Sequence, residues 1–221
     1  DGGMLSGIGS GTSANLGVYT DELTFYGASV VPASFFYTNN VLPNHTTVSS
    51  WWSNGYAQIY AANAVYEGVS ASTKLAPEVK QQLQGEALFV RGLLHFYLVN
   101  LYGAIPYVTS TDYTVNSVVT RQSVAEVYDL VIADLEMAQS LLPEAYVNPA
   151  RIRPNKAVAT ALLARVYLYH GDYAEASNAA SAVLNDTGIY GFPTNINNTF
   201  LKDSSSTLWQ LIPATNGRNT S

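Results

Sequence analysis

One long apolar segment, residues 85–108, constrains this chain more than any other stretch. Large hydrophobic side chains recur in it at three- and four-residue steps, so they share one face of a helix. Leu93 and Phe96 widen that face until the helix is apolar on nearly all sides, as in a helix at the centre of a fold. Gly103 favours the conformation that ends a helix, and Pro106 prevents the helix from resuming. The segment therefore predicts a buried central helix.

Four further segments carry helical periodicity. One of them starts after Ser123, with Glu126 three residues later, which is the spacing of a capping box. We expect helices over residues 51–69, 124–142, 155–170 and 173–184, a lead-in to the central helix from Pro77, and a short helix near residues 13–16. The composition of residues 33–40 predicts an extended segment or a turn at the two asparagines, and that of residues 207–212 (TLWQLI) predicts a strand.

Short connections between these helices predict antiparallel pairs. The stretch 161–184 matches the tetratricopeptide pattern, with Gly171 near the turn and the small residues Ala176 and Ala180 where two helices approach closely. The predicted fold is mostly α, with tetratricopeptide-like helical hairpins (an α-α superhelix) and long loops. We divide it into a loop-rich N-terminal segment (1–50), a helical scaffold (51–185) and the start of a loop-rich C-terminal region (186–221).

The composition excludes several classes of function. The net charge is −6 and the first basic residue is Lys74, so the first third of the chain offers no basic face for nucleic acid. The chain has no Cys, which excludes disulfides and thiolate metal sites. No His has a second ligand at metal-binding spacing, and no nucleotide-binding or nucleophile motif occurs. We therefore expect no cofactor, no metal and no enzymatic activity.

The charged residues within or beside helices receive structural interpretations. Arg91 is expected to be a buried, paired guanidinium that links helices, and His95 a core histidine. Asp134 and Glu136 point about 200° apart on a helix, so they do not face one substrate together. The cluster of Arg151, Arg153 and Lys156 is interpreted as solvated loop charges.

Aromatic and amide side chains gather in the N-terminal third. Flat aromatic faces stack on sugar rings, and amides and hydroxyls bind sugar hydroxyl groups. Trp52 shares a helix face with Tyr56 and Ile59, which predicts that it belongs to the core, whereas Trp51 is turned about 100° away, where it can be exposed. The alternative for each of these aromatic residues is an ordinary core or interface position. The candidate ligand-binding residues are Trp51, Tyr37, Phe36, Asn40 and Tyr26.

Over residues 51–184 the chain resembles the SusD/RagB family of nutrient-binding lipoproteins of Bacteroidetes. Four signatures occur in the family's order. The first three involve Trp52, Tyr56, Ile59, Ala62 and Asn63; then Glu86, Ala87, Phe89, Arg91, Tyr97, Leu98, Leu101, Tyr102, Gly103 and Pro106; then Arg121, Tyr128, Asp134, Leu135, Ala138, Leu142 and Pro143. The fourth is the tetratricopeptide pair, with Arg153, Pro154, Lys156, Ala161, Leu162, Leu163, Ala164, Tyr167, Leu168, Gly171, Asp172, Tyr173 and Ala176.

The resemblance implies a non-catalytic protein on the extracellular face of the outer membrane. It would capture a glycan or oligosaccharide and deliver it to a SusC/RagA-like TonB-dependent transporter. Members are held at the membrane by a lipid anchor on an N-terminal Cys, and they are about twice this length; this sequence has no such Cys, so we expect it to be a fragment. The alternative is a tetratricopeptide-type adaptor that binds a protein or peptide in a helical groove.

Overall fold

The computed structural model of the protein describes residues 11–29, 31–201 and 204–211. The described residues fall into two compact units: one contains those up to Ala57 together with Leu211, and the other is Gln58–Gln210. The elements of the described residues are α1 (Thr12–Tyr19), α2 (Pro32–Tyr37), α3 (Thr46–Ala71), α4 (Pro77–Tyr102), α5 (Tyr113–Asn116), α6 (Val124–Leu141), α7 (Lys156–His170), α8 (Tyr173–Leu184) and the 3-10 helix η1 (Ile196–Asn198).

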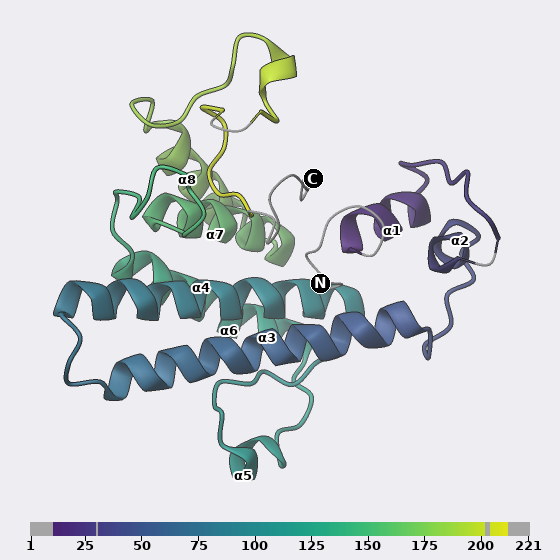
Figure 1. Ribbon diagram of the computed structural model, residues 1–221, viewed down its shortest axis with the longest axis horizontal. Helices are drawn as coiled ribbons and strands as arrows, with labels where there is room; N and C mark the ends of the chain where they lie inside the picture. Colours follow the sequence, from purple (N-terminus) through teal and green to yellow (C-terminus); the bar gives the residue numbers. More distant parts are fainter. Residues whose placement is uncertain (1–10, 30, 202–203, 212–221) are drawn as a thin grey trace. The chain divides into compact units, whose positions relative to one another are not determined.

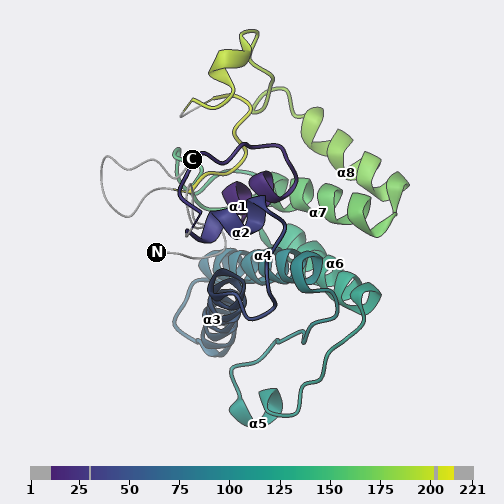
Figure 2. The ribbon, with the colours of Figure 1, turned by 90° about the vertical axis from the view of Figure 1, so that its right-hand side faces the viewer.

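The second unit is a series of antiparallel helices with α4 at its centre. Figure 1 shows α4 running back along α3, and both views place α6 against α4. Helix α6 packs in turn on α7, and α7 on α8 (Figure 2). The mostly helical, tetratricopeptide-like fold is thereby confirmed. None of the helices in the described ranges combines the length and the apolar composition that crossing a bilayer requires.

Helix α4 begins and ends where the sequence predicts. Pro77 occupies its first turn, and Gly103 ends it with a φ of 72°, a conformation that side chains disfavour. Two glycines on its buried face let α6 approach closely: a Cβ on Gly85 would lie 2.8 Å from Leu142 Cγ, and one on Gly92 would lie 3.0 Å from Leu135 Cγ. The packing of α4 on α6 therefore depends on positions without side chains.

The predicted capping box opens α6. The Ser123 hydroxyl accepts a hydrogen bond from the Glu126 N–H at 3.3 Å, and the Glu126 carboxylate accepts one from the Ser123 N–H at 2.8 Å. Both donors would otherwise be unsatisfied at a helix start.

Replacing Ser123 with alanine is expected to lower the free energy of unfolding by about 1 kcal/mol, because the cap hydrogen bond is lost. Urea unfolding monitored by circular dichroism measures the change. Ser140→Ala, near the other end of α6, is the control: its hydroxyl bonds the Met137 carbonyl within the same helix, and we expect a change of a few tenths of a kcal/mol. Equal losses in the two variants would contradict the role of the cap.

The α7–α8 hairpin also follows the prediction. The Asn155 side chain caps α7 by accepting a hydrogen bond from Val158 N–H at 3.1 Å. Gly171 follows His170 with a φ of 101°, and α8 spans Tyr173–Leu184 as expected. The left-handed glycine reverses the chain within two residues, so the two helices pack as a tight pair.

The prediction for residues 33–40 is right only in part. These residues are not extended, because α2 occupies Pro32–Tyr37 and a proline in the first turn is pre-organised for a helix, but Thr38 and Asn39 form the turn predicted as the alternative. The strand predicted over residues 207–212 is wrong. Residues 207–211 form no strand, and Ile212 lies outside the described residues. This segment makes one backbone hydrogen bond to a neighbouring loop, from Gln210 N–H to the Arg151 carbonyl at 3.1 Å, and side chains supply its other contacts, so no ladder forms.

Candidate functional site

Three of the five predicted ligand-binding residues are exposed on the first unit. The side chain of Tyr26 is 92% exposed in the segment between α1 and α2, and Tyr37, the last residue of α2, is 39% exposed. Asn39 adopts a left-handed φ of 52° directly after α2, and Asn40 follows on the surface. The Tyr37 ring lies 6.1 Å from that of Phe25. The end of α2 thus brings an aromatic face and exposed amide side chains together.

The other two predicted residues are buried. Trp51 is 2% exposed and Phe36 is 4% exposed, and their ring centroids are 5.4 Å apart. The prediction of an exposed Trp51 is therefore wrong. It assumed one core along all of α3, whereas the first turns of α3 pack on α2. Phe36 and Trp51 thus pack against each other inside the first unit, next in sequence to the exposed Tyr37.

Trp52 differs from its prediction in the opposite way. It is half-buried instead of belonging to the core, and its ring lies 4.8 Å from that of Tyr56 one turn later. The buried face of α3 includes Ile59 and Asn63, as the periodicity predicts. Trp51 is thus the more deeply buried of the two tryptophans, the reverse of what helix geometry alone predicts.

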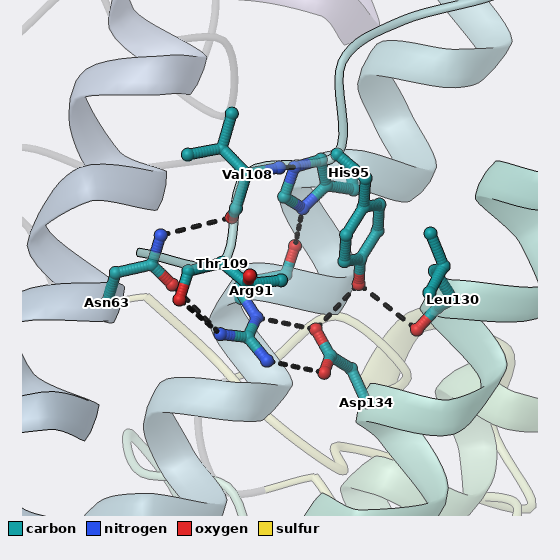
Figure 3. A network of polar contacts seen from close by, with 8 residues as sticks. Asn63, Arg91, His95, Val108, Thr109, Leu130 and Asp134 are labelled. Atoms are coloured by element: carbon teal, nitrogen blue, oxygen red, sulfur yellow. Dashed lines mark hydrogen bonds and ion pairs between the residues drawn. The ribbon is translucent and has the colours of Figure 1, made fainter. Parts of the chain in front are cut away.

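A buried polar network joins α3, α4 and α6 in the second unit (Figure 3). Arg91 on α4 donates two hydrogen bonds of 2.6 Å to the Asp134 carboxylate on α6. A third, of 2.9 Å, goes to the side-chain carbonyl of Asn63 on α3. Burial lowers the pKa of Arg91, but the hydrogen bond and the attraction of Asp134 outweigh burial and raise it above its ordinary value. Arg91 is therefore a charged, paired guanidinium that links three helices, as predicted.

The same network fixes the segment that follows α4. His95 is fully buried and its Nε2 accepts a hydrogen bond from Val108 N–H at 3.2 Å. Its Nδ1 must then carry the proton, which it donates to the Arg91 carbonyl at 3.0 Å. Burial lowers the pKa of His95 to about 3, so the ring is neutral. The Asn63 amide adds a hydrogen bond of 3.0 Å to the Val108 carbonyl.

Tyr107 completes the network. Its hydroxyl lies 2.6 Å from Asp134 Oδ2, its ring stacks on His95 with a centroid distance of 3.9 Å, and burial raises its pKa well above the ordinary value. Every one of these charged and polar groups is enclosed and partnered, so the network offers a substrate no accessible acid, base or nucleophile. Its role is to hold α3, α4, α6 and the segment after α4 in one arrangement.

The basic cluster around the start of α7 stays partly solvated, as interpreted, but each of its members also has a specific partner: the Arg153 and Lys156 side chains are 40% and 43% exposed. Arg153 makes two hydrogen bonds of 2.7 Å to the Glu86 carboxylate on α4. Lys156 pairs with Glu144 at 2.8 Å, and Arg151 bonds the Thr207 carbonyl and lies over two tyrosine rings. These side chains tie the loop to other elements because each has a specific partner within reach. Within the part of the chain that the structure describes, no group of three His, Cys, Asp or Glu residues is placed to hold a metal ion.

Residues 19–168 match the sequence profile of the SusD-like family, which is described as starch-binding and associating with the outer membrane. SusD-like protein P2 of Formosa agariphila is 33% identical over 141 residues, which cover 63% of this chain and 27% of that protein. SusD-like protein P25 of the same organism is 25% identical over 171 residues, or 75% of this chain and 32% of that protein. The chain thus spans about a third of the length of these relatives or less.

Solved structures show the same fold. A SusD superfamily protein from Bacteroides thetaiotaomicron is 27% identical and superposes with a TM-score of 0.74 over 86% of this chain and 44% of its own. A laminarin-binding SusD-like protein superposes with a TM-score of 0.83 over 92% of this chain and 46% of its own. At 23% identity, the second likeness concerns the fold alone.

Proposed function

From the premise that this chain belongs to the SusD-like family of starch-binding, outer-membrane-associated proteins, we propose that it is part of a cell-surface protein that captures a glycan without changing it. The observation that carries the proposal is the exposed, uncharged surface at the end of α2. There Tyr37 offers an aromatic ring and Asn40 a polar side chain, and both lie on the surface. Aromatic rings stack on the apolar faces of sugars, while amides bind their hydroxyl groups.

We assign direct contact with sugar to Tyr26, Tyr37 and Asn40. Phe36 and Trp51 serve as the packed support of that surface, because side chains 4% and 2% exposed have no free face for a sugar ring. Packing on Phe36 and Trp51 would reduce the conformational entropy that the exposed residues lose on binding, which favours affinity.

The captured glycan would pass to a SusC-like TonB-dependent transporter. The protein would be anchored by lipid on the extracellular face of the outer membrane, and its helical scaffold would position the binding loops. Binding and release suffice for this function. The enclosed Arg91–Asp134 network supports a non-catalytic scaffold, because its carboxylate is saturated by Arg91 and Tyr107.

Calorimetric titration with laminarin and soluble starch tests the proposal. Laminarin is the ligand of a structurally similar SusD-like protein, and starch is the ligand for which the family is described. Tyr37→Ala is expected to raise the dissociation constant about tenfold, equivalent to the loss of one aromatic contact worth about 1.4 kcal/mol. Tyr60→Ala is the matched control, since Tyr60 is a tyrosine of α3 that is 54% exposed and lies outside the proposed surface. Equal effects of the two variants would contradict the assignment.

A further inference from the structure

The segment after α8 forms a loop whose two ends are joined by hydrogen bonds between Gly191 and Ser205, and this junction is called the neck. Gly191 N–H donates to the Ser205 carbonyl at 3.1 Å, and the Ser205 hydroxyl donates to the Gly191 carbonyl at 2.8 Å. The Ser206 hydroxyl donates to the Thr199 carbonyl at 3.2 Å, which ties the far part of the loop to its base. Compact loops whose ends lie close together are frequently functional.

A group of buried and half-buried side chains anchors the neck. Tyr190 is 8% exposed, and its hydroxyl lies 2.7 Å from that of Tyr146 and accepts a hydrogen bond from the Asn155 amide at 3.1 Å. The Arg151 guanidinium lies over both tyrosine rings, 5.3 and 5.5 Å from their centroids, and also donates to the Thr207 carbonyl. The loop is therefore fixed at its base to the segment between α6 and α7.

Several side chains of this loop are exposed to solvent and do not help to hold the described residues together. Phe192 is 82% exposed and Phe200 is 95% exposed, although phenylalanine is ordinarily buried. Between them lies η1, where the side chains of Asn197 and Asn198 are exposed and make no hydrogen bond to any part of the chain that is described. Along the sequence, two exposed phenylalanines thus stand on either side of two asparagines whose side-chain amides make no hydrogen bond within the described residues.

The chemistry of this surface selects its ligand. Residues 187–201, which carry both phenylalanines and both asparagines, contain no Asp, Glu, Lys, Arg or His, so this stretch itself supplies no charge to bind an ionic ligand. Aromatic faces and primary amides without charge are the combination that neutral sugars require, one for the ring and the other for the hydroxyl groups.

We propose that the loop formed by residues 191–201 and closed by Ser205 is a second glycan-binding site, in which Phe192 and Phe200 stack on sugar rings and Asn197 and Asn198 bind sugar hydroxyls. The inference rests on the proposed function, since it adds a site for the same class of ligand. This loop belongs to the second unit, whereas the surface at the end of α2 belongs to the first.

The test compares three variants of the full chain by calorimetric titration with laminarin and soluble starch. Phe200→Ala is expected to raise the dissociation constant about tenfold, and Phe200→Trp, which keeps a flat ring, is expected to retain binding. Ile196→Ser is the matched control: Ile196 is 79% exposed in the same loop but has no flat face, so the affinity for sugar should not change. In a nitrogen-15-labelled sample, the side-chain amide signals of Asn197 and Asn198 are expected to shift on addition of the polysaccharide. Circular dichroism confirms that each variant is folded.

Each outcome has a distinct meaning. If the unaltered chain binds and Tyr37→Ala weakens binding while Phe200→Ala does not, the second site is refuted and the proposed function stands. If Ile196→Ser weakens binding as much as Phe200→Ala, the loop is an apolar docking surface and the glycan assignment is wrong. If the unaltered chain binds neither polysaccharide, the proposed function fails for these ligands and the second site fails with it.

Discussion

Replacing Asp134 with alanine is expected to lower the free energy of unfolding by about 3–5 kcal/mol, because it leaves the buried Arg91 guanidinium without its counter-ion. Asp134 also accepts the 2.6 Å contact from the Tyr107 hydroxyl, so that group loses a partner as well. Urea unfolding followed by circular dichroism measures the loss. Because the network joins α3, α4 and α6, we expect one cooperative transition shifted to lower urea, with an unchanged slope.

Two variants make this test specific. Asp129→Ala removes a carboxylate from the same helix whose side chain is 71% exposed and lies 4.0 Å from the His170 ring; it should cost less than about 1 kcal/mol. The double variant Arg91→Leu with Asp134→Leu should recover part of the loss, because no buried charge remains unpaired. Similar losses in Asp134→Ala and Asp129→Ala would show that the buried pair does not hold the helices together.

Acidification is expected to destabilise the second unit through His95. The pKa of this buried ring is about 3 in the folded protein, against an ordinary value of 6.5. Below pH 6.5 the unfolded chain therefore binds a proton that the folded chain does not. The free energy of unfolding should fall as the pH decreases from 6.5 towards 3, by about 1.4 kcal/mol for each pH unit well inside that window.

The range from pH 6.5 to 5 isolates this effect, because carboxylates titrate mainly at lower pH. Over it we expect a loss of roughly 2 kcal/mol in the unaltered chain. His95→Gln retains an amide that can bond Val108 and does not titrate, so its stability should change less over the same range. Parallel stability profiles for the two chains would show that His95 is not the group responsible.

The sequence predicts the helical scaffold well because local signals and burial agree there. Gly103 and Gly171 end helices with left-handed backbones, and Ser123 begins one with a capping box. The apolar periodicity of α4 also matches its burial in the structure. The backbone selects the residue type at the helix ends, and burial selects it along α4, so the two signals indicate the same helices.

The candidate site is harder to predict because it depends on contacts between distant segments. Helix geometry assigns Trp51 to the surface, but Phe36 of α2 covers it, and no pattern within α3 reports that contact. Residues 207–211 have a strand-like composition, yet no strand in the described part of the chain pairs with them. Tertiary contacts decide both cases, and local sequence does not encode them.

The buried network could be predicted from the sequence only in part. Asn63, Arg91 and Asp134 stand in three separate helical signatures, and the sequence predicts a paired Arg91 without identifying either partner. The structure shows that they meet at hydrogen-bonding distances of 2.6–2.9 Å. Polar residues at otherwise apolar helix positions were the available signal, and matching them across helices would have indicated their contact.

The most direct test of glycan capture is a calorimetric titration of the unaltered chain with laminarin and soluble starch. Chromatography of the sugar recovered from the calorimeter afterwards shows whether it has been cleaved. We expect saturable binding of at least one of them, with the polysaccharide recovered at its original length. Release of shorter sugars would show that the protein is an enzyme. The absence of binding to both polysaccharides by the folded chain would contradict glycan capture and favour a tetratricopeptide-type adaptor for a protein or peptide.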